Sequence, residues 1–348
     1  MTDPLILAQR HLAKQRRVAT ATMASALREW GLMDATDLRG SWSSVGPRLV
    51  TVLTAGQMAA AGGANEYVDS VASAQSAAGA DASVNPAAFA GVAADGRSLD
   101  TLMLRPLFTT FEAIKAGSTP AQALSAGRGL LATIIRSEVA DAGRGAVGAG
   151  IAGRRTIHGY VRVVSPPACS RCIILAGKEY GWNKGFQRHP RCDCVHLPTT
   201  LIAHNQHRGL RADSGRRGFT DPHAYFNSLS RTEQDRIFTA AGARAIRDGA
   251  SMSQVVNARR GMYTADAYAR RVAATREGAT RRGAFYRLER ARTEARTGIR
   301  FARDRIEARQ GLPRFELRSP RLLPEEIYRL AEDREDAIRL LRRFGYLT

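Results

Sequence analysis

The chain has 348 residues, of which 44% are hydrophobic and 24% charged, a composition typical of globular proteins with room for two or three domains. No apolar stretch approaches the roughly 20 residues that are needed to cross a bilayer. The first ten residues contain too short an apolar run for a secretory signal peptide. These features exclude a membrane protein, and we expect no membrane partner.

The net charge of +20 is concentrated in the second half of the chain. Residues 1–150 carry 13 Lys and Arg against 12 Asp and Glu, whereas residues 151–348 carry 39 against 20. Nearly all of the excess is arginine, whose guanidinium group binds phosphate in a bidentate manner. We therefore expect non-specific contact between this half and nucleic acid. The alternative is an Arg- and Ala-rich composition that reflects a GC-rich genome, with the charges solvated.

The N-terminal third has the pattern of long helices. Asp3-Pro4 forms a helix cap and first-turn pair, and Gly31 ends the helix that this pair opens. A second helix is predicted from Pro47 to about Ala61. The clearest helix runs from Thr119-Pro120 to about Ala142, because its apolar residues keep spacings of three and four. Residues 61–96, rich in Ala, Gly and Ser, fit either a flexible link or closely packed small-residue helices.

The pattern changes after a glycine-rich stretch at residues 143–153. Residues 160–164, Tyr-Val-Arg-Val-Val, have the composition of a β-strand. Residues 195–197, Val-His-Leu, predict a second short strand. A tight turn is expected between the two strands at Gly177-Lys178.

All four cysteines of the chain lie between residues 169 and 194. Sixteen residues separate Cys169-Ser-Arg-Cys172 from His189-Pro-Arg-Cys192-Asp-Cys194. A CxxC pair beside a second cluster of soft ligands is typical of a tetrahedral zinc site, and clustered cysteines argue against a disulfide framework. Zinc takes four ligands, so one of five candidates is spare: Cys169, Cys172, His189, Cys192 and Cys194. We predict one structural Zn²⁺ per chain, on turns between short strands in a zinc-ribbon-like layout.

The region after residue 202 is predicted to be helical and basic. Its helical segments are residues 230–248, opened by the capping box Ser230-Arg-Thr-Glu233 and ended by Gly249; 254–260, ended by Gly261; 281–309, rich in arginine; a helix opening at 323–328; and 333–344. The ion pairs expected in the arginine-rich segment are Arg290/Glu294, Arg300/Asp304 and Arg303/Glu307.

These patterns together predict a fold that is mainly α with a small β-rich zinc-binding module (α+β). We expect three domains. They are a helical N-terminal domain over residues 1–150, a zinc-knuckle or ribbon-like module over residues 151–202, and a basic helical C-terminal region over residues 203–348.

Other conspicuous side chains are predicted to be structural or to face partners. His11, His158 and His223 have no ligand-spaced neighbours and are expected at the surface or in helix caps. Trp182 is expected to pack over the zinc module. The predicted helix over residues 119–142 offers an apolar face for a partner protein, with Leu130, Leu131, Ile134 and Ile135 among its residues.

One further pattern extends beyond the zinc ligands. The CxxC at Cys169, the segment Ala176-Gly-Lys-Glu-Tyr180 and His189-Pro-x-Cys-x-Cys194, closing on Pro198, resemble the signature of the MuF-like minor head (minor capsid) protein family of tailed bacteriophages. Asp193 stands where that signature usually has arginine, a departure that does not touch a ligand. Additional segments look like the actinobacteriophage branch of this group: 226–236, 245–250, 255–262, 321–328 and 339–346.

The resemblance implies a virion protein of few copies that acts in head morphogenesis. Such a protein associates with the portal or the major capsid protein on the inside of the capsid and is made in the host cytoplasm. The basic half would then contact packaged DNA without sequence preference. The resemblance does not imply an enzyme.

Two enzymatic alternatives stay open. A capsid maturation protease would use Cys192 as nucleophile with His189 or His196 as base, although a thiolate bound to zinc is not available for attack. An HNH-like zinc nuclease would need a further histidine and an acidic or Asn ligand at a catalytic metal. His204 and His207 follow the cysteine stretch, but the chain contains no Asp-His dipeptide.

Overall fold

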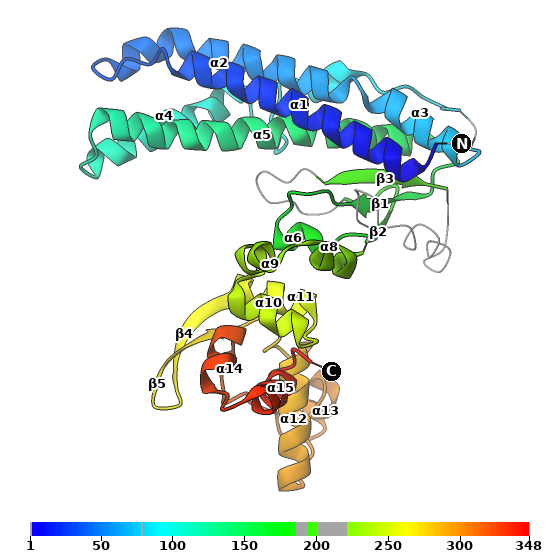
Figure 1. The fold of residues 1–348 in the computed structure, drawn as a ribbon, viewed down its shortest axis with the longest axis vertical. Coiled ribbons are helices and arrows are strands. Elements are labelled where there is room, and N and C mark those ends of the chain that lie inside the picture. The colour runs from blue at the N-terminus through cyan, green and yellow to red at the C-terminus, as the bar shows by residue number, and fades with distance from the viewer. Residues whose placement is uncertain (1, 78, 186–193, 201–220, 348) are drawn as a thin grey trace. The chain divides into compact units, whose positions relative to one another are not determined.

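The computed structural model describes residues 2–77, 79–185, 194–200 and 221–347 (Figure 1). Helices dominate these residues, and the strands form two small antiparallel sheets of three strands each. The prediction of a mainly α chain with a small β component is therefore confirmed. Among the described residues, no helix is long and apolar enough to cross a membrane.

The chain divides into two compact units. The first contains residues 1–168 and 175–221, and the second contains residues 169–174 and 222–348. The chain thus enters the second unit briefly at the CxxC and then returns to the first. A division by contacts does not show which parts of the chain fold on their own. The three predicted domains therefore stay a prediction.

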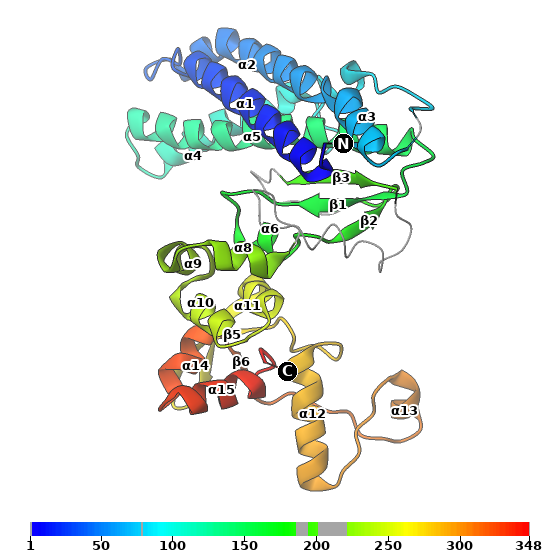
Figure 2. The same cartoon turned by 45° about the vertical axis from the view of Figure 1, so that its right-hand side comes forward.

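Long helices form most of the first unit (Figures 1 and 2). They are α1 (Pro4–Trp30), α2 (Leu38–Ala61), α3 (Ala64–Ala74), α4 (Leu99–Lys115) and α5 (Pro120–Ala152), with a 3₁₀ turn η1 (Pro86–Phe89). The side chain of Asp3 accepts a hydrogen bond from the Leu5 amide, as its predicted capping role requires. At the start of α5, Thr119 and Gln122 form a complete capping box.

Two helices are longer than predicted. Helix α2 begins at Leu38 rather than at Pro47, because Asp37 caps it and Pro47 is accommodated inside. Helix α5 continues through the glycine-rich stretch to Ala152. Residues 61–96 contain α3 and η1.

Glycines in α5 allow neighbouring helices to approach closely. A Cβ atom at Gly127 would lie 2.3 Å from Thr110 Oγ1 of α4 and 2.7 Å from the Trp30 ring of α1. A Cβ at Gly143 would lie 2.5 Å from Gln15 Oε1. Because these glycines have no side chain, the neighbouring helices lie directly against the α5 backbone. The glycine-rich stretch therefore continues α5 and does not end it.

A sheet of three strands packs on these helices. Strand β1 (Gly159–Val163) lies between β2 (Glu179–Gly181) and β3 (Val195–Thr199), and both pairings are antiparallel. One set of alternating residues, Val161, Val163, Val195 and Leu197, belongs to the hydrophobic core shared with α1, α3 and α5. The predicted strands and the turn at Gly177, whose φ is +72°, are confirmed.

The second unit contains short helices and a β-hairpin. Its helices are α6 (Ser170–Ile173), α8 (Pro222–Ser228), α9 (Arg231–Phe238), α10 (Ala240–Arg247), α11 (Met252–Ala258), η2 (Arg259–Gly261), α12 (Ala284–Thr297), α13 (Arg305–Arg309), α14 (Pro324–Leu330) and α15 (Arg334–Arg343). Its strands are β4 (Met262–Ala267), β5 (Arg270–Thr275) and β6 (Arg321–Leu322), in the order β4-β5-β6.

Two predicted helices are interrupted. Thr239, at φ +68°, separates α9 from α10, and its hydroxyl caps α10 by accepting from the Gly242 amide. Gly298, at φ +67°, ends α12 well before residue 309. Of the three expected ion pairs, Arg290–Glu294 is present at 3.9 Å, whereas Arg300 instead pairs with Glu307 at 3.1 Å.

A buried arginine, Arg321, organises the C-terminal part of the second unit. Arg321 donates to the carbonyl oxygens of Phe344 and Glu277, each at 2.8 Å, and to Gln254 Oε1 at 3.1 Å. Its guanidinium also lies 4.2 Å from the centre of the Tyr346 ring. Burial lowers the pKa of this arginine. The Arg321 side chain thereby connects β6 with the end of α15 and with the segment that follows β5.

The two glycines Gly127 and Gly129 in α5 provide a matched test of the helix packing. Gly127→Ala should destabilise the protein by about 1–3 kcal/mol, because the added methyl overlaps Thr110 and Trp30. Gly129→Ala has nothing within 4 Å of its Cβ and should stabilise the helix by about 0.5–1 kcal/mol. Urea unfolding followed by circular dichroism measures both. Equal effects of the two substitutions would contradict the close packing at Gly127.

The prediction that His11 lies at the surface is wrong. Its ring is buried and stacks on Tyr67 with 4.0 Å between ring centres. Burial, with a contribution from nearby Lys14, lowers the pKa of His11 from 6.5 to about 4. The folded state therefore holds this ring neutral where the unfolded chain would protonate it.

This burial predicts a pH-dependent stability. Because the folded pKa lies below the unfolded one, stability is lost as the pH falls from about 6.5 to about 4, by up to about 3 kcal/mol. His11→Phe should remove this part of the pH dependence. The control Tyr67→Phe deletes a hydroxyl that does not titrate in this range, so its effect should be equal at both ends. Unchanged pH dependence in His11→Phe would show that the ring titrates normally.

Candidate metal centre

The two cysteines of the CxxC open a short helix of the second unit. Cys169 is exposed and Cys172 is buried, and the carbonyl oxygen of Cys169 accepts from the amides of Cys172 and Ile173, each at 3.0 Å. Helix α6 packs against α8 and α11. The CxxC therefore lies at a helix start, not on a turn between strands as the zinc-ribbon-like layout predicted.

Cys194 lies in the first unit, directly before β3. Its thiol is buried, and Nη2 of Arg162 lies 3.3 Å from its sulfur atom. Arg162 is on the central strand β1, opposite His196 of β3, and its side chain is only 1% exposed. A guanidinium donor at a sulfur atom stabilises the negative charge that a metal-binding thiolate carries.

Aromatic rings surround this arginine–thiol contact. On the same set of alternating positions as Arg162, Tyr160 stacks on His196 at 4.1 Å and on Tyr180 at 5.1 Å between ring centres. The Tyr160 hydroxyl donates to the Lys184 carbonyl at 2.6 Å, and Tyr67 of α3 donates to the His196 carbonyl at 2.8 Å. Burial raises the pKa of Tyr180. The rings and bonds fix the strand positions from which Arg162 and Cys194 approach each other.

Two of the five candidate ligands, His189 and Cys192, lie outside the described residues. Within the described residues no group of three or more His, Cys, Asp or Glu side chains forms a metal site. Cys169 and Cys172 belong to one unit and Cys194 to the other, and no disulfide joins any two of these three cysteines. Which candidate is spare therefore stays open.

The described donors fit the chemistry of a zinc ligand set. Cysteine sulfur atoms, with a cationic hydrogen-bond donor at one of them, suit a soft divalent metal. The strand pattern of residues 160–164 does not by itself predict a role for Arg162. The available signal was an arginine inside an apolar strand, because such a charge is buried only with a partner.

The residues of the enzymatic alternatives are mostly outside the described part of the chain. This applies to Cys192, His189, His204 and His207, so neither a protease dyad nor an HNH-type ligand set is tested. His196 is described and stacks on Tyr160. Trp182 is 53% exposed, and its predicted packing over the zinc module stays a prediction because residues 186–193 lie outside the described part of the chain.

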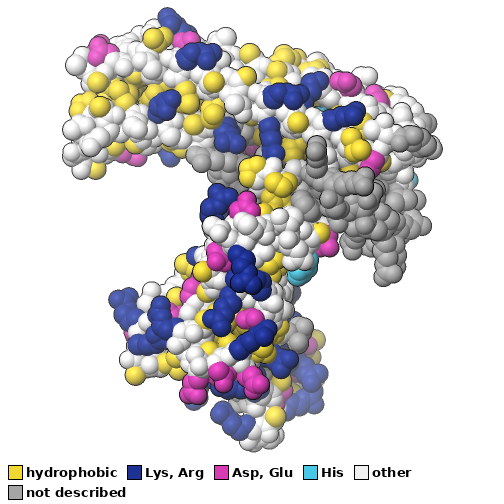
Figure 3. Space-filling model, in the orientation of Figure 1, with side chains coloured by type: hydrophobic (Ala, Val, Ile, Leu, Met, Phe, Trp, Pro, Cys, Tyr) yellow, Lys and Arg dark blue, Asp and Glu magenta, His cyan; other side chains and the backbone are white. Residues whose placement is uncertain are grey.

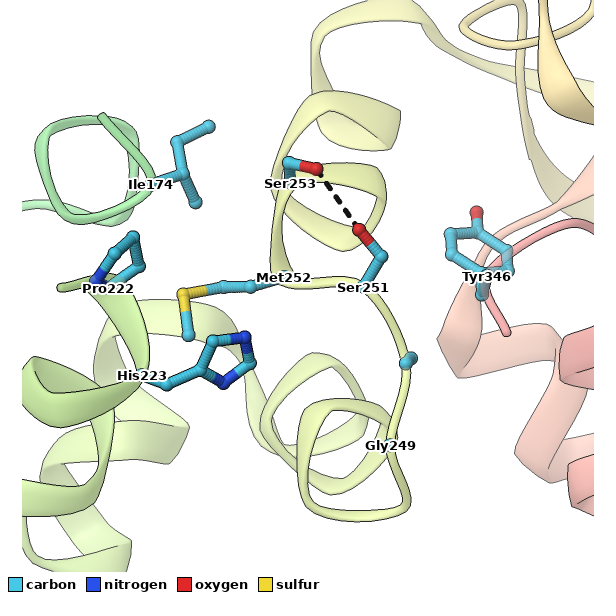
Figure 4. Close-up of a pocket in the computed structure, with 9 residues that line it drawn as sticks. Ile174, Pro222, His223, Gly249, Ser251, Met252, Ser253 and Tyr346 are labelled. Atoms are coloured by element: carbon cyan, nitrogen blue, oxygen red, sulfur yellow. Dashed lines mark hydrogen bonds between the residues drawn. The ribbon is translucent and has the colours of Figure 1, made fainter. Parts of the chain in front are cut away.

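A separate hollow of about 400 Å³ lies in the second unit (Figure 4). Its walls include His223, Met252 and Tyr346, and the hydroxyls of Ser251 and Ser253 hydrogen-bond to each other at 3.0 Å.

The comparison with protein families identifies the class of this protein. The profile of a family described as VG15 protein matches residues 5–213, more than half of the chain. This is a bacteriophage protein. The chain belongs to the VG15 protein family, and the matched range runs from α1 through the whole cysteine stretch. No protein of curated function and no solved structure matches it.

The family match also extends the part of the chain with known relatives. The VG15 match begins in α1 and covers the helical part of the first unit and the sheet that carries Arg162 and Cys194. Most of the second unit, from α8 onward, lies beyond the matched residues.

Proposed function

We propose that this phage protein is a minor capsid protein of the MuF-like type, present in few copies in the head and associated with the portal or the inner capsid. The observation that carries this proposal is the family match over residues 5–213, within which lie the CxxC, Gly-Lys and His-Pro-x-Cys-x-Cys elements. In this proposal the protein is part of the virion and is made in the host cytoplasm.

The role that we propose is structural. The cysteine stretch would bind one Zn²⁺ through four of its five candidate ligands, with Arg162 donating to Cys194. Zinc would supply tetrahedral coordination that orders the cysteine stretch. Cysteine thiolates committed to zinc are not available as nucleophiles, which favours this role over a maturation protease.

The apolar face of α5 that the sequence offers to a partner is largely turned into the first unit, with Leu130 and Ile134 half-buried. Leu131 and Ile135 are fully buried inside the first unit, so they are not available to a partner. The side chains of Leu32 and Phe108 are 58% and 47% exposed. We infer that such exposed apolar residues of the helical unit, rather than the face of α5, contact the assembly partner.

The zinc site predicts a role for Arg162 that metal analysis can test. Protein purified without chelator should hold one zinc per chain, and Arg162→Gln should weaken zinc binding by about ten- to a hundredfold, because a partner of a ligand is lost. Competition with a chromogenic chelator measures the affinity. The control Arg171→Gln removes the same charge from an exposed position between Cys169 and Cys172 and should bind zinc normally.

Three results would contradict the zinc site. They are purified protein without zinc, cysteines found as disulfides in fresh material, and equal zinc affinity in Arg162→Gln and Arg171→Gln. Thermal melting of each variant separates a loss of affinity from a loss of fold. Arg162→Lys, which keeps the positive charge, should recover part of the affinity.

The head assignment predicts incorporation during assembly. Co-expression with the portal and major capsid proteins of the same phage should yield procapsids that contain the chain in far fewer copies than the major capsid protein. Leu32→Ser with Phe108→Ser should lower incorporation, while the buried core of the first unit stays intact. Quantitative mass spectrometry of purified particles measures both. Particles without the chain, from co-expression and from infected cells alike, would overturn the assignment.

A further inference from the structure

Two adjoining hollows of the second unit share one face of α12. The first, of about 450 Å³, lies between α12 and α15. The second, of about 510 Å³, lies between α12 and residues 314–319. Both are lined by Glu289, Thr293 and Arg296, whose spacing of three and four residues puts them on one side of the helix. The two hollows therefore form one continuous surface, which we call the α12 groove.

Arginine dominates the lining of the α12 groove. Its six arginines are Arg292, Arg296, Arg314, Arg318, Arg339 and Arg343, and its two acidic residues are Glu289 and Glu316. This gives the lining a formal charge of +4. Figure 3 shows how closely basic and acidic side chains are interspersed on the visible face of this unit.

The acidic neighbours offset only part of this charge. Glu289 pairs with Arg292 at 3.0 Å and with Arg343 at 3.9 Å, and Arg339 pairs with Asp336. In the described part of the chain, Arg296, Arg314 and Arg318 form no ion pair. All three are exposed. The charge that is left without a carboxylate therefore gathers on α12 and on the segment opposite to it.

Aromatic contacts hold the walls of the groove in place. Tyr286 of α12 donates to the Phe315 carbonyl at 2.8 Å, and the two rings meet edge to face at 5.1 Å. Phe301 contacts Phe315 at 5.4 Å, and Phe285 contacts Phe344 at 5.5 Å. The backbone that carries Arg296, Arg314 and Arg318 is thus fixed before any ligand arrives, which lowers the entropy cost of binding.

The shape and chemistry of the groove fit a polyphosphate chain. Guanidinium groups bind phosphate oxygens in pairs, and α12, with 14 residues, is about 21 Å long. That length corresponds to about six base-pair steps of duplex DNA. We propose that the α12 groove binds the backbone of duplex DNA without reading its sequence. This inference rests on the proposed function, which brings the protein close to packaged DNA.

The test uses the full-length protein and a short DNA duplex of mixed sequence over a range of salt concentrations. The triple variant Arg296→Glu, Arg314→Glu and Arg318→Glu should bind about a hundredfold more weakly at low salt. Its salt dependence, as the slope of log affinity against log salt, should be shallower by about 3, since about three phosphate contacts are lost.

A matched control has the same change in net charge outside the groove. Arg260→Glu, Arg271→Glu and Arg281→Glu alter three exposed arginines of the second unit that line neither hollow. This variant should keep the wild-type salt slope and lose affinity only through the long-range field. If both triple variants lost the same amount of DNA affinity and of salt slope, the inference that the α12 groove binds DNA would be wrong. It would also be wrong if polyglutamate bound the wild-type protein more tightly than DNA does.

The DNA-binding role of the α12 groove and the assignment to the phage head can be disproved independently of each other. If the chain is present in heads and its groove variant binds DNA like wild type, the groove inference is wrong and the head assignment stands. If the chain is absent from heads while the groove variant has lost DNA binding, the groove stands and the head assignment is wrong. Thermal melting of both triple variants confirms that each is folded.

Discussion

The fold depends on how it buries guanidinium groups. Among the residues that the structure describes, the three largest fully buried side chains are Arg154, Arg162 and Arg321. An arginine inside a protein is stable only with partners that replace its hydration. Arg154 donates to Asp69 of α3 at 2.7 Å and to the end of α5. Arg321 donates to three backbone carbonyls. Each arginine fixes distant segments in one arrangement, because any other arrangement would leave a buried charge unpaired.

The same constraint connects Arg162 with the candidate metal centre. One set of residues on the sheet packs into the helical core, and the other holds Tyr160, Arg162 and His196. A sulfur atom is a weak hydrogen-bond acceptor when neutral and a better one when charged. A cationic donor at this distance favours the thiolate form of a cysteine. The contact with the buried Cys194 sulfur also gives Arg162 a partner inside an otherwise apolar strand.

Sequence patterns predicted the elements whose signals are local. Asp3-Pro4, the Thr119 and Ser230 caps and the strand near Tyr160 were all found where side chains and backbone interact within a few residues. The misses depend on contacts between distant segments. The glycines near residue 143 pack against Gln15, and the ring of His11 is buried by Tyr67. The β4–β5 hairpin turns at Tyr268-Ala269, both with φ of +56°, where no glycine or asparagine signals the turn. At the site, the cysteine spacing identified candidate ligands, but the position of Arg162 beside Cys194 follows from strand register.

The structure of the second unit offers a physical reason for the excess of arginine in the second half of the chain. A surplus of arginine that merely reflected genome composition would be expected to pair evenly with nearby carboxylates or to spread over the surface. Many arginines here do form ion pairs, including Arg290, Arg292 and Arg339. The unpaired ones in the α12 groove, however, come from two segments that converge, α12 and residues 314–319. Like charges brought together repel one another and destabilise the fold. Aromatic contacts at Tyr286, Phe301 and Phe315 hold these segments together. A polyanion that lies along the groove would turn this repulsion into attraction, so the arrangement favours binding over solubility as the reason for the charge.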